Sequence, residues 1–197
     1  MKILSQALTA TAMAVCLVIP ATSMAAGSQV TAGVNSASGK IYVNSTLYTL
    51  SGTGAHISAD IAVGDKLGFM LSSRSASPSS TDKSIDFMDV GVRYRLGEDT
   101  STYFSSNRTK VGSNSETIMM LGAMHHISTG EASSLALKIG TSTSNMFDDL
   151  EVGFEFNMGF MDALMLNIGY KSTVTTLAKT STKATSSGFN VSIGAQF

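Results

Sequence analysis

The sequence predicts an all-β fold, a transmembrane antiparallel up-and-down β-barrel of about ten strands, with counts of 8 to 12 left open. Three observations predict it. Apolar and polar residues alternate with a period of two, the alternating segments run to about 9–11 residues, the length of a tilted membrane strand, and short connections alternate with longer ones. Charged residues make up only 14% of the 197 residues, against about 25% in an ordinary globular chain.

The alternation is clearest in four segments, which are 88–96, 134–142, 148–158 and 163–171. In DDLEVGFEFNM the apolar positions are Leu150, Val152, Phe154, Phe156 and Met158. The opposite face of each segment mixes charged residues with glycine, and the apolar face has almost no charge at mid-strand. This pattern favours a strand with lipid on one side and a polar lumen on the other.

Extending the same pattern over the chain gives ten expected strands. They are 40–50, 55–63, 66–73, 84–96, 101–109, 117–127, 134–142, 148–158, 163–173 and 187–197. Residues 28–36 could form a further strand. Strand 101–109 is the least apolar of the set.

The connections differ in length from one side of the expected barrel to the other. The short ones are 64–66, 97–100, 128–132 and 159–162, and the longer polar ones are 74–83, 110–116, 143–147 and 173–187. An even strand number places both chain ends on the short-turn side, which is periplasmic in bacterial outer-membrane barrels.

The first 26 residues have the features of a secretory signal peptide. Lys2 precedes an apolar run from Ala10 to Ile19, and Ser23-Met24-Ala25 fits the small-x-small cleavage rule. The apolar run is shorter than the roughly 20 residues of a membrane helix. We therefore expect residues 1–26 to be removed with Cys16, the one cysteine, which leaves a single barrel domain at 27–197 without disulfides.

The carboxyl-terminal GFNVSIGAQF alternates and ends in an aromatic residue. A closed barrel must pair its last strand with its first, so the last strand has to be complete and amphipathic. The ending resembles the assembly signal of Gram-negative outer-membrane proteins, carried here by Phe189, Val191, Ile193 and Phe197. The resemblance implies the barrel assembly machinery and periplasmic chaperones as partners, and a location in the cell outer membrane beside lipid and lipopolysaccharide.

A second resemblance covers residues 117–171 and the end of the chain. DDLEVGFEF and LMLNIGYK, spaced as paired strands, and NVSIGAQF resemble the YfaZ-type family of small outer-membrane barrels. OmpA- and OmpX-like barrels share the expected architecture without a matching motif. Both resemblances imply a small cell-envelope protein.

The polar faces predict charge pairs inside the barrel. If the turn at 159–162 is tight, facing residues have numbers that sum to about 322, which pairs Glu151 with Lys171 and Glu155 with Asn167. A similar register brings Lys138 near Glu151. We expect a second cluster from Asp89, Arg93 and Arg95. Because buried charges are costly unless they are paired, the favoured interpretation is a salt-bridge network that plugs a narrow barrel, with a polar channel as the alternative.

The expected function is a structural role or a narrow, mostly occluded, porin-like pore. A net charge of −1 gives no basic field for nucleic acid. The sequence predicts no enzymatic activity and no cofactor or metal site. We expect the protein to be a monomer. Three alternatives remain. They are a binding or adhesion protein that uses loops 74–83 and 173–187, a lipid-A-modifying barrel enzyme with His126 and Ser128, and a soluble periplasmic β-sandwich.

Overall fold

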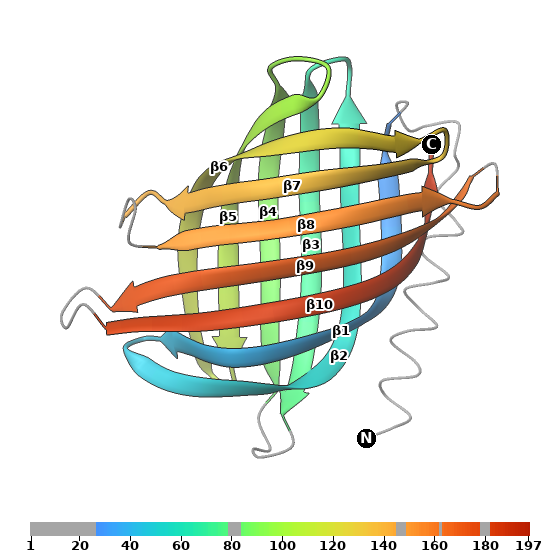
Figure 1. Cartoon of the computed structure of the whole chain (residues 1–197). Helices are drawn as coiled ribbons and strands as arrows, with labels where there is room; N and C mark the ends of the chain where they lie inside the picture. The colour runs from blue at the N-terminus through green and yellow to red at the C-terminus, as the bar shows by residue number, and fades with distance from the viewer. Residues whose placement is uncertain (1–26, 79–83, 145–148, 162, 178–181) are drawn as a thin grey trace.

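The computed structural model describes residues 27–78, 84–144, 149–161, 163–177 and 182–197 (Figure 1). The ten strands are β1 (Gln29–Val43), β2 (Thr46–Val63), β3 (Leu67–Pro78), β4 (Ile85–Arg95), β5 (Thr100–Val111), β6 (Asn114–Gly130), β7 (Ser133–Ser142), β8 (Leu150–Gly159), β9 (Leu164–Leu177) and β10 (Thr182–Gln196). None of the described segments is a helix long and apolar enough to cross a membrane. The expected signal peptide, with Cys16, lies outside the described residues.

The ten strands form one closed antiparallel barrel in which each strand pairs with its neighbours in the chain. The first and last strands close it, with pairs that run from Gln29 opposite Gln196 to Gly39 opposite Ser186. The Gly27 N–H donates to the Phe197 carbonyl at 2.7 Å, so both described ends lie beside the short turns. The predicted fold class and strand number are confirmed. We call this end of the barrel proximal and the opposite end distal.

The expected strand 40–50 is wrong, because a hairpin turn divides it. Asn44 and Ser45 have φ values of 50° and 64°, and two consecutive residues in this region form the tight turn that suits twisted antiparallel strands. Residues before the turn continue β1 back to Gln29 and therefore include the possible extra strand at 28–36. The count stays at ten because the former first strand is shared between β1 and β2.

Three of the four longer connections at the distal end, 74–83, 110–116 and 173–187, consist partly of strand, whereas the described residues of 143–147 do not. Val111 pairs with Asn114, so the expected loop 110–116 is a two-residue turn. In the same way β3 extends to Pro78, β9 extends to Leu177 and β10 starts at Thr182. The reason is that serine- and threonine-rich segments can keep the antiparallel hydrogen-bond ladder while both faces remain polar. Such segments do not alternate in hydropathy, so they resemble loops in the sequence.

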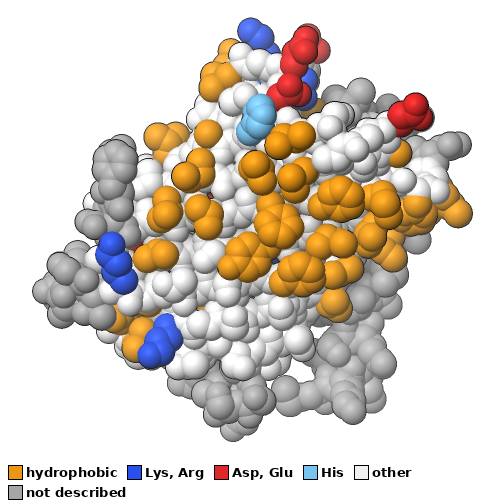
Figure 2. Space-filling model, in the orientation of Figure 1, with side chains coloured by type: hydrophobic (Ala, Val, Ile, Leu, Met, Phe, Trp, Pro, Cys, Tyr) orange, Lys and Arg blue, Asp and Glu red, His pale blue; other side chains and the backbone are white. Residues whose placement is uncertain are grey.

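The outer surface carries an apolar belt (Figure 2). Its exposed large residues come from every strand, and Ile193 at 59% and Phe69 at 50% are examples. The rings of Phe154 and Tyr170 stack at 5.8 Å on neighbouring strands of this belt. Contiguous exposed apolar surface of this extent matches the lipid-facing band of a membrane barrel.

The inside of the barrel is filled with side chains, as expected for this strand number. At the distal end the filling is apolar, with Ile41, Val43, Leu50, Ile85 and Val111 in one buried cluster. Charged residues occupy the middle, and polar residues occupy the proximal half. The distal apolar cluster was not predicted from the sequence.

Candidate functional site: the charged layer in the lumen

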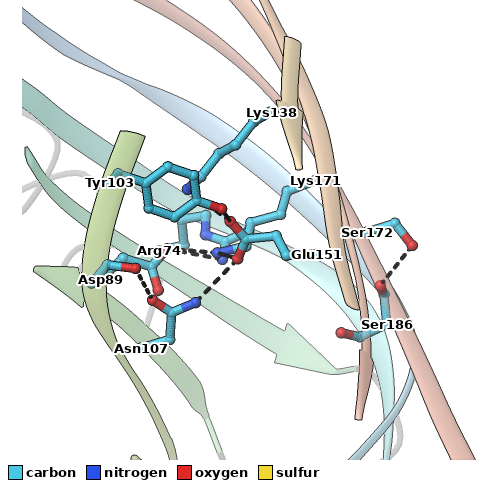
Figure 3. Close-up of polar contacts among 10 residues, drawn as sticks. Arg74, Asp89, Tyr103, Asn107, Lys138, Glu151, Lys171, Ser172 and Ser186 are labelled. Carbon is cyan, nitrogen blue, oxygen red and sulfur yellow. Dashed lines mark hydrogen bonds and ion pairs between the residues drawn. The ribbon is translucent and has the colours of Figure 1, made fainter. Parts of the chain in front are cut away.

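Glu151 on β8 is at the centre of the charged layer. Its side chain is 0% exposed, and each carboxylate oxygen contacts one lysine. Lys138 Nζ lies 2.7 Å from Oε1, and Lys171 Nζ lies 2.6 Å from Oε2 (Figure 3). The two lysines belong to β7 and β9, so the three charges link three neighbouring strands across the lumen wall.

Tyr103 reaches the same carboxylate from two strands further away. Its hydroxyl donates to Glu151 Oε1 at 3.2 Å, and the Lys138 ammonium lies 4.3 Å from the centre of its ring. The ring crosses β6 and β7 at Gly122 and Gly140, which pair with each other. A Cβ atom at either glycine would collide with the tyrosine side chain. Glycine at these two positions therefore allows the aromatic ring to lie flat against the lumen wall.

Asp89 and Asn107 extend the layer to β4 and β5. Lys171 donates to Asp89 Oδ2 at 3.0 Å, and Arg74 Nη2 lies 3.6 Å from the same oxygen. Asn107 Nδ2 donates to Glu151 Oε2 at 3.1 Å. Arg74 also stacks over the Phe87 ring, with its guanidinium carbon 5.2 Å from the ring centre. The layer therefore spans the lumen instead of lining one wall.

The register between β8 and β9 differs from the expected one by two. Gly159 pairs with Met165, so facing residues sum to 324 because the turn is wider than expected. Gly153 then lies between Lys138 and Lys171, and Glu155 pairs with Gly169 instead of Asn167. The predicted pairing of Glu155 with Asn167 is wrong.

Long side chains compensate for the shifted register at Glu151 but not at Glu155. Glu151 and Glu155 lie two positions on either side of Gly153 along β8, and both lysines extend to Glu151. Glu155 faces the proximal part of the lumen. No cation among the described residues lies within ion-pair distance of its carboxylate.

The expected cluster of Asp89, Arg93 and Arg95 does not form. Asp89 joins the central layer, whereas Arg93 Nη2 contacts Asp60 Oδ1 at 2.8 Å. Gly68 on β3 leaves the space through which Arg93 crosses to β2, since the guanidinium lies just above it. Arg95 is exposed at the proximal rim. Alternation placed the three residues on one face correctly but could not tell which partner each side chain reaches.

The charged layer separates two cavities. The distal cavity has a volume of about 70 Å³ and the proximal one about 120 Å³. Arg74, Asp89 and Lys171 line both cavities, so the layer forms the partition between them. Both cavities are polar in part of their lining and exceed the roughly 10–15 Å³ that one water molecule needs, so both can be hydrated.

Uncharged hydrogen bonds also cross the proximal half of the lumen, in addition to the Arg93–Asp60 ion pair. Asn190 Nδ2 donates to Asn167 Oδ1 at 2.9 Å, and Asn167 Nδ2 donates to Asn157 Oδ1 at 2.7 Å. His56 Nδ1 and the Ser192 hydroxyl are 2.9 Å apart. These contacts tie β8, β9, β10 and β2 together below the charged layer.

His126 and Ser128, the residues of the enzyme alternative, lie at the proximal end of β6. His126 points into the lumen, where its Nε2 is buried without a hydrogen-bond partner. Ser128 is exposed beside the β-bulge between Ser128 and Gly130. Among the described residues no hydrogen bond joins the two side chains, and no group of three or more His, Cys, Asp or Glu residues could hold a metal ion.

The residues of the expected assembly signal lie on the closing strand. Phe189, Val191 and Ile193 are exposed on the outer face of β10. Phe197 follows the strand, and its backbone N–H donates to the Ser28 carbonyl at 2.9 Å. The last strand therefore presents its apolar face outward while its backbone pairs with β1 and β9.

Sequence reasoning missed three members of the charged layer, Arg74, Tyr103 and Asn107. Arg74 was assigned to a loop, although it continues the lumen-facing positions of β3. Tyr103 and Asn107 belong to the strand with the weakest alternation. The paired glycines on β6 and β7 were the available signal, because they leave room for a large side chain on a neighbouring strand.

No model of a known protein family matches the chain. The curated proteins give no match either. The predicted resemblance to the YfaZ-type family is therefore not established.

Several solved structures share partial likeness with the barrel. Neisserial surface protein A has a TM-score of 0.42 at 13% identity, over 87% of this chain and 98% of that chain. Ail, the attachment invasion locus protein of Yersinia pestis, has a TM-score of 0.40 at 13% identity, over 88% of this chain and 100% of that chain. The translocator domain of the autotransporter NalP from Neisseria meningitidis has a TM-score of 0.46 at 9% identity, over 98% of this chain and 95% of that chain. At these scores the assignment of the fold depends on the strand pairing of this chain itself.

Proposed function

We propose that this protein is an integral outer-membrane β-barrel with a structural role, whose lumen is sealed against free passage of solutes. One observation carries the proposal: the partition made by Glu151 and its neighbours separates the two cavities. The apolar cluster around Leu50 adds a second seal at the distal end. Any pore is then narrow and mostly occluded, and no catalytic role or cofactor is needed.

Placement in the outer membrane is supported by the surface and by the ends of the chain. The apolar belt requires a lipid environment, and a closed barrel satisfies its backbone hydrogen bonds there without an open edge. The signal-like residues 1–26 and the closing strand fit export and insertion by the barrel assembly machinery with periplasmic chaperones. On this proposal the short turns face the periplasm. The protein works as a monomer, surrounded by lipid and lipopolysaccharide. We also propose that it is related to the YfaZ-type barrels.

The proposal is tested by expressing the full-length chain in a Gram-negative host and separating the membranes. We expect the protein in the outer-membrane fraction, with an unboiled band that migrates differently from the boiled band because the closed barrel resists detergent. A soluble periplasmic protein without a mobility difference would contradict the proposal and favour a β-sandwich. Lipid A from cells that express the H126A and S128A variants should be unchanged, whereas a difference would favour the enzyme alternative.

A further inference from the structure

The outer surface above the apolar belt is a wall of hydroxyl groups. Antiparallel pairing places Ser172, Ser187, Ser38 and Ser51 side by side on β9, β10, β1 and β2. The Ser38 and Ser187 hydroxyls are 3.1 Å apart. A second row nearer the belt has Ser36, Thr53 and Ser77 on β1, β2 and β3. We call these two rows the hydroxyl wall.

The hydroxyl wall is continuous with the belt below it. On β1 the exposed Val34 is followed by Ser36 and Ser38, and on β10 the exposed residues Ile193, Val191 and Phe189 lead up to Ser187. In Figure 2 the apolar side chains give way to an area without apolar or charged groups, with basic side chains beyond it. A molecule that lies along this surface therefore needs an apolar part and a large hydroxyl-bonding part.

The part of the β1–β2 hairpin above the belt extends beyond the head group of a glycerophospholipid, and the hydroxyl wall is its lower part. Residues 36–43 and 46–53 form the part of the β1–β2 hairpin above the belt. Eight residues at about 3.3 Å each, tilted by about 40°, rise roughly 20 Å along the barrel axis. The head-group layer of a bilayer adds only about 5–8 Å to each side of the hydrocarbon. The hairpin above the belt is more than twice that height, which suits a head group of several sugars.

The charge of the wall also selects its partner. Among the described residues of β9, β10, β1, β2 and β3, no outward position carries Asp or Glu. The charged outward residues there are Lys40 and Lys183, near the distal end. A soluble surface would normally mix both signs of charge over about a quarter of its residues. The absence of acids favours contact with an anionic molecule.

We infer that the hydroxyl wall is a docking surface for a lipid with a phosphorylated, multi-sugar head group, the chemistry of lipopolysaccharide. Its acyl chains lie on the belt, its sugars form hydrogen bonds with the serine and threonine rows, and its phosphates lie near Lys40 and Lys183. This inference rests on the proposed function, because it needs the distal end to face the outer leaflet. It assigns the lipid to one side of the barrel, from β9 through β1 to β3.

The test uses the purified, folded full chain in detergent with lipopolysaccharide as the probe. The comparison lipid is phosphatidylglycerol, added at the same phosphate concentration, because it is anionic but has no sugars. The test variant is S38D/S51D, which puts two negative charges on paired outward positions of the wall. The matched control is T129D/S133D, which makes the same change at the proximal turn, where the two hydroxyls are 2.9 Å apart. Lipid retained through gel filtration gives the apparent affinity.

We expect the unmodified chain and T129D/S133D to retain lipopolysaccharide equally and in preference to phosphatidylglycerol, with at least tenfold weaker retention by S38D/S51D. Equal retention by all three proteins, or an equal loss in both variants, would overturn the docking surface. If S38D/S51D does not fold, T53D/S77D on the second row makes the same test. A chain that shows no heat-modifiable band would instead contradict the proposed function, so the two failures are distinguishable.

Discussion

Tyr103 donates a hydrogen bond to Glu151 across two intervening strands, both of which carry glycine where the ring crosses them. This contact joins β5 to β8, which are not neighbours in the barrel. The two side chains meet along the lumen wall and link two strands that no backbone hydrogen bond joins. The interior therefore contributes to the shape of the barrel as well as to its closure.

The Gly140→Ala variant tests this crossing. A Cβ atom at residue 140 would collide with the Tyr103 hydroxyl, so the ring has to leave its position and the hydrogen bond to Glu151 is lost. We expect the free energy of unfolding to fall by about 1–3 kcal/mol, as for overpacked sites. The free energies of unfolding of the variant and the unmodified barrel are measured by guanidinium titration of the reconstituted proteins. Gly97→Ala is the control, because open space surrounds residue 97, and an equal loss there would contradict the explanation.

The two glutamates of β8 should respond differently to the same substitution. Glu151→Gln removes a fully buried charge that two lysines share, and breaking a buried pair costs about 3–5 kcal/mol. Glu155→Gln removes a charge with no ion-pair partner among the described residues, so we expect a change within about 1 kcal/mol. Unfolding midpoints of the two variants give the comparison. Equal destabilisation would mean that Glu155 takes part in the network.

Asp60 and Arg93 should behave as an isolated pair. Their contact at 2.8 Å is separate from the ion pairs around Glu151. In a double-mutant cycle with Asp60→Asn and Arg93→Gln, we expect a coupling energy of about 1–3 kcal/mol. A cycle between Asp60 and Lys138 should give a value near zero. Similar coupling in both cycles would indicate one continuous network.

Closure between the first and last strands can be tested by cross-linking. Val34 pairs with Val191 on the outer face, so the V34C/V191C variant should be joined by a short thiol reagent in the folded state. V34C/V90C is the control, because Val90 lies on β4, three strands away from β1. Absence of the cross-link in V34C/V191C would indicate an open sheet.

The sequence predicted the architecture well wherever one face of a strand is apolar. Segments such as 148–158 alternate strongly because lipid and lumen impose opposite requirements on successive residues. The prediction failed above the belt, where β1, β9 and β10 are polar on their outer face. There a strand and a loop have similar composition, and the turn at Asn44-Ser45 is visible only through its backbone conformation.

The lumen was predicted in part. The sequence placed Glu151 between Lys138 and Lys171 although the assumed register was wrong by two, because a lysine side chain is long enough to span the shift. The positions of Arg93 and Glu155 depended on the register and on small neighbours such as Gly68, so those predictions failed. Tyr103 was missed because its strand has little apolar content.

The central claim, a sealed lumen, is tested most directly by the conductance of the purified barrel in a planar bilayer. The folded, unmodified protein should insert and produce no lasting current steps, because the charged layer and the distal apolar cluster close the lumen. The Glu151→Ala variant, measured in parallel, should give intermittent steps if its barrel remains folded. Steady current steps from the unmodified protein would contradict the sealed lumen and establish an open pore.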